Sequence, residues 1–197
     1  MNRLRRLARS NPLPVALVAE GLLIPLALGL AWLLGQSPWD DFHWPLGTLL
    51  LAIAFTAPLV ALLGLFTALG PRWFRELENI VRPAVDALFR GQGRAAVILA
   101  ALLAGFGEEL LFRGVLQAWL ADGLGPWLGL GLASVVFGFM HAVSPAYFVV
   151  ATVMGLYLGA LYHFTGNLVL ASLVHAIYDW IAIEMVLRRI DRDPDAD

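Results

Sequence analysis

The sequence contains no cysteine and no lysine, and only 14% of its 197 residues are charged. Without cysteine, neither a disulfide nor a thiolate metal site can form. What remains is unusually apolar: 60% of the residues are hydrophobic and the mean hydropathy is +0.77. Soluble domains average about 45–50% apolar residues. The composition therefore favours a polytopic membrane protein over a soluble globule.

Long apolar runs divide the chain into six expected membrane-spanning helices, each close to the roughly 20 residues that cross a bilayer. They are expected at residues 13–34, 46–70, 95–120, 126–143, 146–164 and 168–187. The first run follows an arginine-rich N-terminus, as in a secretory signal. Its length, its Glu20 and the lack of a clear cleavage motif favour a retained span. We therefore expect an all-α, polytopic membrane helix bundle that forms one domain over residues 1–197.

Arginine clusters predict the orientation of this bundle. They lie before the first span, between the second and third spans, and after the sixth span. With six spans, all three clusters fall on one side, which the positive-inside rule assigns to the cytoplasm. We expect an integral protein of the plasma (inner) membrane with both termini cytoplasmic. The acidic tail, residues 191–197, is expected to be disordered.

The segment 71–93, between the second and third spans, has the pattern of an interfacial amphipathic helix. Apolar side chains follow helical spacing on one side and charged side chains occupy the other. Pro83 predicts a break, and the glycines at 91 and 93 predict the end of the helix. A solvated connector is the favoured role, and a cytoplasmic flap near a substrate entrance is the alternative.

Carboxylates and an arginine lie inside the third span, where each charge costs about 2.5–3.5 kcal/mol on insertion scales. Glu109 and Arg113 are four residues apart, so they share a helix face and can form an ion pair. Glu108 points about 100° away from Glu109, and we expect it to face a reaction cavity. The alternative is that all three form a buried network that specifies the fold.

Two histidines occupy other spans. His175 and Asp179 are one helical turn apart, a spacing that lets a carboxylate fix the tautomer of an imidazole. His141 follows Phe137 by four residues, which places both rings on one face. A lone histidine on an apolar helix is usually a packed core residue. Two histidines and Glu108 on three different helices favour a shared polar site.

Two mechanisms fit these residues. Zinc could be held by His141 and His175 with Glu108 or Asp179, because such sites take three protein ligands and a water. Without metal, Glu108 could act as general base on water with help from His141. His175 and Asp179 would then stabilise the oxyanion, the latter only if protonated or through the imidazole. Both mechanisms stay open at this point.

Three ordered motifs resemble the CPBP family of CAAX prenyl proteases and bacteriocin-processing (Abi) intramembrane endopeptidases. They read EELLFR at 108–113, FGFMH at 137–141 and HAIYD at 175–179, within a family-like core of about residues 95–185. The resemblance implies a catalytic set in which the first glutamate activates water and the first histidine assists it. That set is Glu108, Glu109, His141, His175 and Asp179. Eukaryotic prenyl proteases carry Asn at the last position, and the extra carboxylate here favours metal binding or a protonated Asp.

The expected function is therefore hydrolysis of peptide bonds in membrane-associated substrates of the CAAX or bacteriocin-leader type. The expected partners are membrane lipid and a peptide or prenylated peptide, with no nucleic acid. One competing function is a proton-coupled transporter, in which Glu20 would join a Glu/His relay. Another is a non-catalytic immunity or scaffold protein.

The depths at which Glu108, His141 and His175 are expected in the membrane differ, and this argues against a shared site. At 1.5 Å per residue, Glu108 lies about 20 Å from the cytoplasmic start of its span. His141 lies about 22 Å, and His175 about 10 Å, from the outer starts of theirs. Tilted helices, or a third span that begins below the membrane surface, could reconcile these depths.

Overall fold

The computed structural model describes residues 11–192, and every regular element in that range is a helix. The whole first arginine cluster (Arg3, Arg5, Arg6 and Arg9), and residues 193–197 of the expected disordered tail, lie outside the described part. The elements are α2 (Leu13–Leu34), η1 (Pro38–Asp41), α3 (Thr48–Leu69), α4 (Arg72–Phe89), α5 (Arg94–Glu109), η2 (Leu110–Gln117), α6 (Ala118–Leu124), α7 (Pro126–Met140), α8 (Pro145–Thr165) and α9 (Leu168–Arg192). The predicted all-α membrane bundle is confirmed.

Within residues 11–192, five helices are long and apolar enough to cross a membrane: α2, α3, the continuous 31-residue helix from Arg94 to Leu124, α8 and α9. The chain is thus an integral membrane protein. The expected span at 126–143 is shorter than predicted, because α7 has only 15 residues, or about 22 Å of helix. A residue before proline disfavours the helical conformation. Ser144 is accordingly extended before Pro145 and caps α8 by accepting a hydrogen bond from the backbone N–H of Tyr147 at 3.1 Å.

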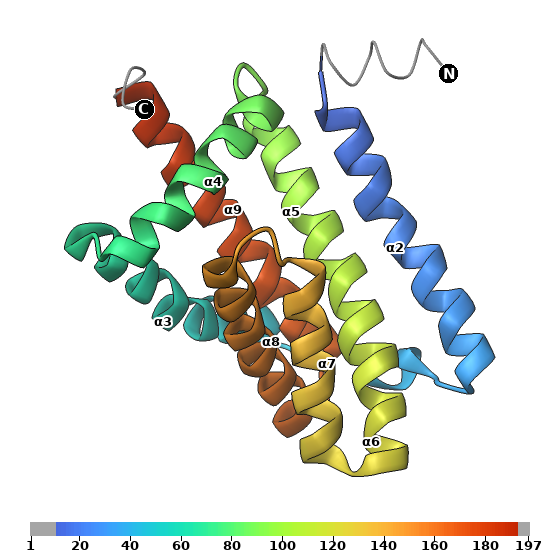
Figure 1. Ribbon diagram of the computed structural model, residues 1–197. Coiled ribbons are helices and arrows are strands. Elements are labelled where there is room, and N and C mark those ends of the chain that lie inside the picture. The colour runs from blue at the N-terminus through green and yellow to red at the C-terminus, as the bar shows by residue number, and fades with distance from the viewer. Residues whose placement is uncertain (1–10, 193–197) are drawn as a thin grey trace.

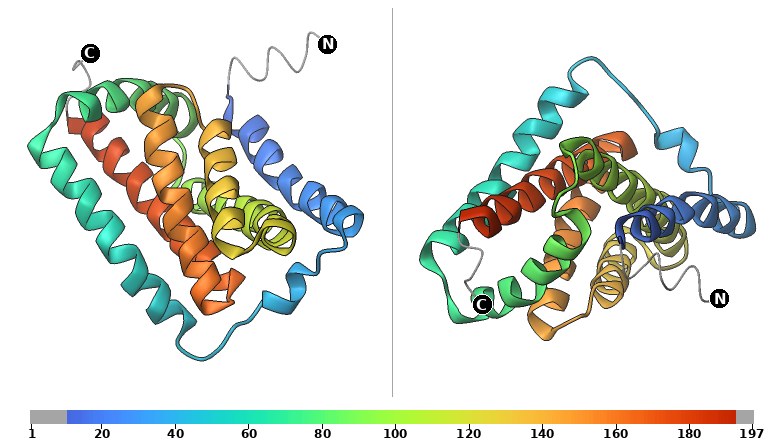
Figure 2. Two further views of the ribbon diagram at one scale, coloured as in Figure 1. Left: turned by 60° about the horizontal axis from the view of Figure 1, so that its bottom comes forward. Right: turned by 90° about the horizontal axis from the view of Figure 1, so that it is seen from above.

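Because α7 is shorter than expected, its C-terminal end lies inside the bundle and not at the membrane surface. Figure 1 shows α5 and α9 at the centre of the bundle, the α7–α8 hairpin beside them, and α2 and α3 on the two flanks. The views in Figure 2 also place α2 and α3 on opposite sides. The α7–α8 turn stops well short of the end that α5 and α9 reach (Figure 1). His141 therefore ends inside the bundle, which removes the difference in depth expected from straight, full-length spans.

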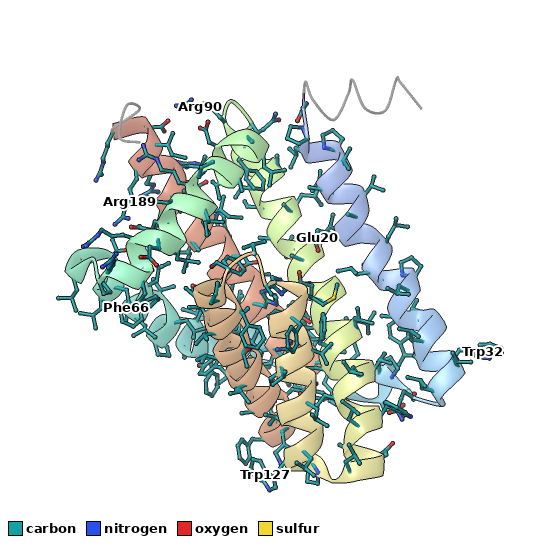
Figure 3. The ribbon with its side chains drawn as sticks, in the orientation of Figure 1. Glu20, Trp32, Phe66, Arg90, Trp127 and Arg189 are labelled. Carbon is teal, nitrogen blue, oxygen red and sulfur yellow. The ribbon has the colours of Figure 1, made fainter. Side chains whose placement is uncertain are left out.

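The two ends of the bundle differ in chemistry. Arg90 and Arg189 lie at the end of the bundle where α2 begins and α9 ends, and Trp127 lies at the opposite end (Figure 3). Trp127 packs edge-on against His163 in the last turn of α8. Arginine at one end and tryptophan at the other agree with the positive-inside pattern and with an aromatic interface belt.

Close helix crossings surround the centre. A Cβ atom at Gly105 would lie 2.8 Å from the backbone oxygen of Ser172, so only glycine lets α5 cross α9 this closely. At Gly107 a Cβ atom would lie 3.1 Å from the backbone oxygen of Glu20, on the other side of α5. The helix that carries Glu108 is therefore held tightly between α9 and α2.

The segment 71–93 forms one amphipathic helix, α4, which lies across the arginine-bearing end (Figure 1). The predicted break at Pro83 is wrong, because α4 continues through this residue. Proline removes one backbone hydrogen bond from a helix. Burial of the apolar face offsets that loss; its buried residues are Phe74, Leu77, Val85 and Phe89.

Candidate active site

The two adjacent glutamates diverge at the end of α5. Glu109 is fully buried, and Glu108 is 8% exposed at the wall of a cavity. The next eight residues form the π-helix η2. π-Helical turns are rare and are often found at functional sites. This junction sends one carboxylate into the helix packing and leaves the other facing the cavity.

Glu109 is the centre of a buried polar network. Its Oε1 accepts from Arg113 Nη1 at 2.7 Å and from His175 Nδ1 at 2.8 Å. Arg113 also donates to the Gly155 carbonyl at 3.0 Å, and its guanidinium lies 4.7 Å from the ring centroid of Phe137. One carboxylate thus joins η2 to α9, and the arginine extends the network to α7 and α8.

Glu109 also sets the orientation of His175. A carboxylate only accepts hydrogen bonds, so Nδ1 of His175 carries the proton and Nε2 faces the cavity. The sequence predicted this orienting role for Asp179. Instead, Asp179 Oδ2 lies 3.5 Å from the other ring nitrogen, Nε2. Sequence spacing gave no signal for the Glu109 contact, because the two residues are 66 positions apart on different helices.

His141 is oriented in the same way by the backbone. Its Nδ1 lies 2.8 Å from the Phe137 carbonyl, which can only accept, so this nitrogen is the donor. The two rings pack together with centroids 4.4 Å apart. This arrangement points Nε2 of His141 toward the carboxylate of Glu108.

The three helices bring these groups around one point. Oε2 of Glu108 lies 3.7 Å from Nε2 of His141 and 3.9 Å from Nε2 of His175. Both distances are longer than a direct hydrogen bond. The same Oε2 atom is buried and has no hydrogen-bond partner among the described residues. A carboxylate oxygen without a partner, between two ring nitrogens, is suited to hold a polar reactant.

A cavity of about 300 Å³ opens from this point toward α4. Its polar floor holds Glu108, His141, His175 and Asp179, and its walls are mostly apolar. The wall residues on the amphipathic helix are Phe74, Leu77, Val81 and Val85, opposite residues of α3, α8 and α9. An ion pair between Glu78 of α4 and Arg189 of α9 lies at the edge of the cavity. The segment 71–93 is thus part of the site and more than a solvated connector.

Two cavity residues were not predicted from the sequence. Tyr147 of α8 and Tyr178 of α9 both line the cavity beside the histidines. The ring of Tyr147 stacks on that of His141, with centroids 6.1 Å apart and planes inclined by 17°. A tyrosine in an apolar helix is common, and only the fold distinguishes these two from the others.

Glu20 approaches the same region from α2. Its side chain extends from α2 toward α5 (Figure 3), where its backbone packs on Gly107. Its Oε2 atom is buried and has no hydrogen-bond partner among the described residues. Glu20 is close enough to Glu108 to interact electrostatically, but it does not line the cavity. Glu20 therefore lies near the polar floor without lining the cavity.

A zinc ion in a protein is held by three or four nitrogen, sulfur or oxygen ligands. Within residues 11–192, no group of three or more His, Cys, Asp or Glu side chains has an arrangement that could hold a metal ion. Zinc binding stays a prediction.

About half of the sequence is similar to known proteins. Residues 91–181 match the family described as type II CAAX prenyl endopeptidase Rce1-like. The uncharacterized protein YpbD of Bacillus subtilis (strain 168) is 34% identical over 101 residues, which are 49% of each chain. The match thus spans about half the length of that relative. No solved structure matches the chain significantly. All four residues of the cavity floor fall in the matched range, and the resemblance inferred from the three motifs is confirmed by this match of residues 91–181 to the Rce1-like family.

Proposed function

We propose that this protein is an intramembrane endopeptidase that cleaves membrane-associated peptides with a water molecule activated by Glu108. One observation carries the proposal: Oε2 of Glu108 faces Nε2 of both His141 and His175 at 3.7 and 3.9 Å. A single water between these atoms would contact one carboxylate and two imidazoles, which are the groups that general-base hydrolysis requires. The family match over residues 91–181 supports the same activity.

Each residue of the cavity floor has its own role in the proposed reaction. His141, with its proton on Nδ1, accepts a hydrogen bond from the water at Nε2. Glu108 takes the other water proton as the water oxygen bonds to the peptide carbonyl carbon. His175, with a proton on each ring nitrogen, donates from Nδ1 to Glu109 and from Nε2 toward the oxyanion. The C–N bond then breaks, and Glu108 passes its proton to the leaving amine nitrogen.

The buried network supports this chemistry without touching the substrate. Glu109 and Arg113 are 0% and 1% exposed, so neither can reach a peptide in the cavity. Glu109 instead holds the His175 ring, and Arg113 holds Glu109. Of the predicted catalytic set, Glu109 thus becomes a positioning residue in this proposal. Asp179 borders the cavity next to Nε2 of His175.

The cavity walls suggest the class of substrate. Apolar side chains from four helices line the path between the polar floor and the Glu78–Arg189 pair. An apolar or prenylated segment suits these walls, and CAAX-type peptides and bacteriocin leaders are the proposed substrates. With both termini cytoplasmic in the plasma membrane, α4 would border a cytoplasmic substrate entrance.

The test is cleavage of a quenched-fluorescent farnesylated CAAX peptide, and of the same peptide without farnesyl, by protein in liposomes. We expect the native chain to cleave, and Glu108→Ala and His141→Ala each to lose about 10³-fold or more in kcat. Glu184→Ala is the control, because Glu184 lies on α9 outside the cavity and pairs with Arg188 at 3.9 Å. Full activity in both site variants, or no hydrolysis by the native chain, would contradict the proposal.

Other outcomes favour the competing functions. Flux driven by a pH gradient in the same liposomes, without hydrolysis, would favour a transporter. A biological phenotype that survives loss of both Glu108 and His141 would favour a scaffold or immunity role. Elemental analysis of the purified protein, with activity before and after chelation, decides whether zinc takes part.

A further inference from the structure

The proposed hydrolysis leaves one requirement incompletely met. The tetrahedral intermediate carries a negative oxygen, and preorganised hydrogen-bond donors aimed at it are a large part of such catalysis. Ionised Glu108 and Asp179 can only accept hydrogen bonds. Arg113 is buried and already donates to Glu109 and to the Gly155 carbonyl. On the cavity floor this leaves His175 as the one assigned donor toward the oxyanion.

Two tyrosine hydroxyls line the same cavity and can donate. Tyr147 reaches it from the first turn of α8, and Tyr178 from α9, next to Asp179. They differ in their neighbours. The ring of Tyr147 stacks on His141, whose Nε2 lies 3.7 Å from Oε2 of Glu108, whereas Tyr178 directly precedes Asp179 on α9. Tyr147 is therefore the tyrosine beside the Glu108–His141 pair.

Tyr147 is also held in place from three directions. Its backbone N–H donates to Ser144 Oγ at the start of α8. Its ring stacks on the His141 imidazole with planes inclined by only 17°. It also packs against the buried cluster of Phe112, Phe137 and Ala151. A ring fixed in this way presents its hydroxyl to the cavity with little freedom to lose on binding.

We propose that Tyr147 is a further catalytic residue, whose hydroxyl donates a hydrogen bond to the oxyanion of the tetrahedral intermediate. This inference rests on the proposed function. As the water oxygen bonds to the carbonyl carbon, the carbonyl π electrons move to its oxygen, and Tyr147 stabilises that charge without giving up its proton. When the C–N bond breaks, the carbonyl re-forms and the hydrogen bond weakens.

The experiment compares Tyr147→Phe with Tyr157→Phe, each of which removes one tyrosine hydroxyl from α8. Tyr157 does not line the cavity, and its hydroxyl donates to the Phe55 carbonyl at 2.6 Å. Both variants are measured in liposomes with the farnesylated CAAX peptide, beside Glu108→Gln. We expect Tyr147→Phe to lower kcat by about 10²–10³-fold, the range seen when one oxyanion donor is lost. KM should stay within about twofold, because the contact forms only in the transition state. Tyr157→Phe should keep kcat within about threefold of the native value.

The outcomes separate this inference from the function on which it rests. Native activity in Tyr147→Phe, with Glu108→Gln inactive, would overturn the role of Tyr147 alone. An equal loss in both Phe variants, or a change in KM alone, would also overturn it. An active Glu108→Gln variant would overturn the proposed function itself. If Tyr147→Phe fails to fold, 3-fluorotyrosine at position 147 keeps the ring and the hydroxyl and should retain activity; its inactivity would contradict the role.

Discussion

The two halves of the chain differ in how their helices are packed. In α2 and α3, 11% of the most apolar stretch is buried inside the protein, against 44% in the helix from Arg94 to Leu124 and 44% in α9. Of the ten buried polar or charged residues in the described part of the chain, eight lie in the second half, including Glu109, Arg113 and His175. A membrane offers no water to satisfy such groups, so they need partners fixed by close packing. Dense packing and chemistry therefore occur in the same half.

The first half takes part in a different way. The apolar face of α4 lines the cavity, and the backbone of Glu20 packs against Gly107 of α5. Neither contributes to the polar floor. In the proposed mechanism, the first half therefore borders the cavity and the second half holds the reacting groups. The following changes test this division, from the largest expected effect to the smallest.

Loss of the buried arginine should have the largest effect on stability. Arg113→Met removes the guanidinium of a fully buried ion pair and leaves Glu109 with His175 as its remaining donor; breaking a buried pair typically costs about 3–5 kcal/mol. The matched control is Arg72→Met in the first half, because the Arg72–Glu76 pair is 89% and 63% exposed. Exposed pairs contribute about 0–1 kcal/mol. Thermal unfolding in detergent measures both, and equal melting of the two variants would contradict the comparison.

Helix glycines in the two halves should respond oppositely to an added methyl group, because Gly105 lies at a close helix crossing and Gly64 does not. Gly105→Ala places a Cβ atom 2.8 Å from backbone atoms of α9, and such overpacking costs about 1–3 kcal/mol. At Gly64 of α3, no atom lies within 4 Å of that position. Gly64→Ala should be neutral or stabilise by up to about 1 kcal/mol, because alanine favours helix. Chemical denaturation of the two variants would refute this if Gly105→Ala were the more stable.

Filling the cavity from α4 should affect activity more than stability. Val81 lines the cavity, while its neighbour Ile80 is 39% exposed on the outer face. We expect Val81→Trp to raise KM about tenfold, equivalent to about 1.4 kcal/mol of substrate binding. Ile80→Trp should leave KM unchanged. If both variants bind and cleave the reporter peptide like the native chain, α4 is a connector and not a wall of the substrate site.

Glu20 should show the smallest effect. Because its side chain does not line the cavity, Glu20→Gln should lower kcat less than about tenfold, which is under about 1.4 kcal/mol. The same preparation can be assayed for flux driven by a pH gradient. A loss of peptide cleavage as large as that of Glu108→Ala would move Glu20 into the reacting set. Gradient-driven flux that Glu20→Gln abolishes would instead support the transporter.

The sequence predicted those features of the site that follow from the geometry of a single helix. The four-residue spacing of Glu109 and Arg113, and the 100° between Glu108 and Glu109, are consequences of helical geometry. Between helices, the sequence predicted that Glu108, His141 and His175 share one polar site, but not the individual contacts. The hydrogen bond from His175 to Glu109 and the approach of Tyr147 depend on how α5, α8 and α9 pack. No residue pattern within one helix encodes that packing.

Two errors in the predicted elements have local causes. The apolar run after residue 126 continues past Met140, so hydropathy predicted a longer span than the structure contains. Ser144 and Pro145 end the helical run there, and the resulting short helix is what brings His141 to the depth of Glu108. Pro83 predicted a break in α4, but a surface helix with one well-buried face tolerates one missing hydrogen bond.

The central claim is that Glu108 and His141 act on the same water molecule, and a double-mutant cycle tests it most directly. Glu108→Gln, His141→Ala and the double variant are assayed for kcat on the reporter peptide. Residues that act as a unit show strongly non-additive losses. We predict that the double variant is no slower than the slower single variant. A double variant whose loss equals the product of the two single losses would show independent action and contradict the account.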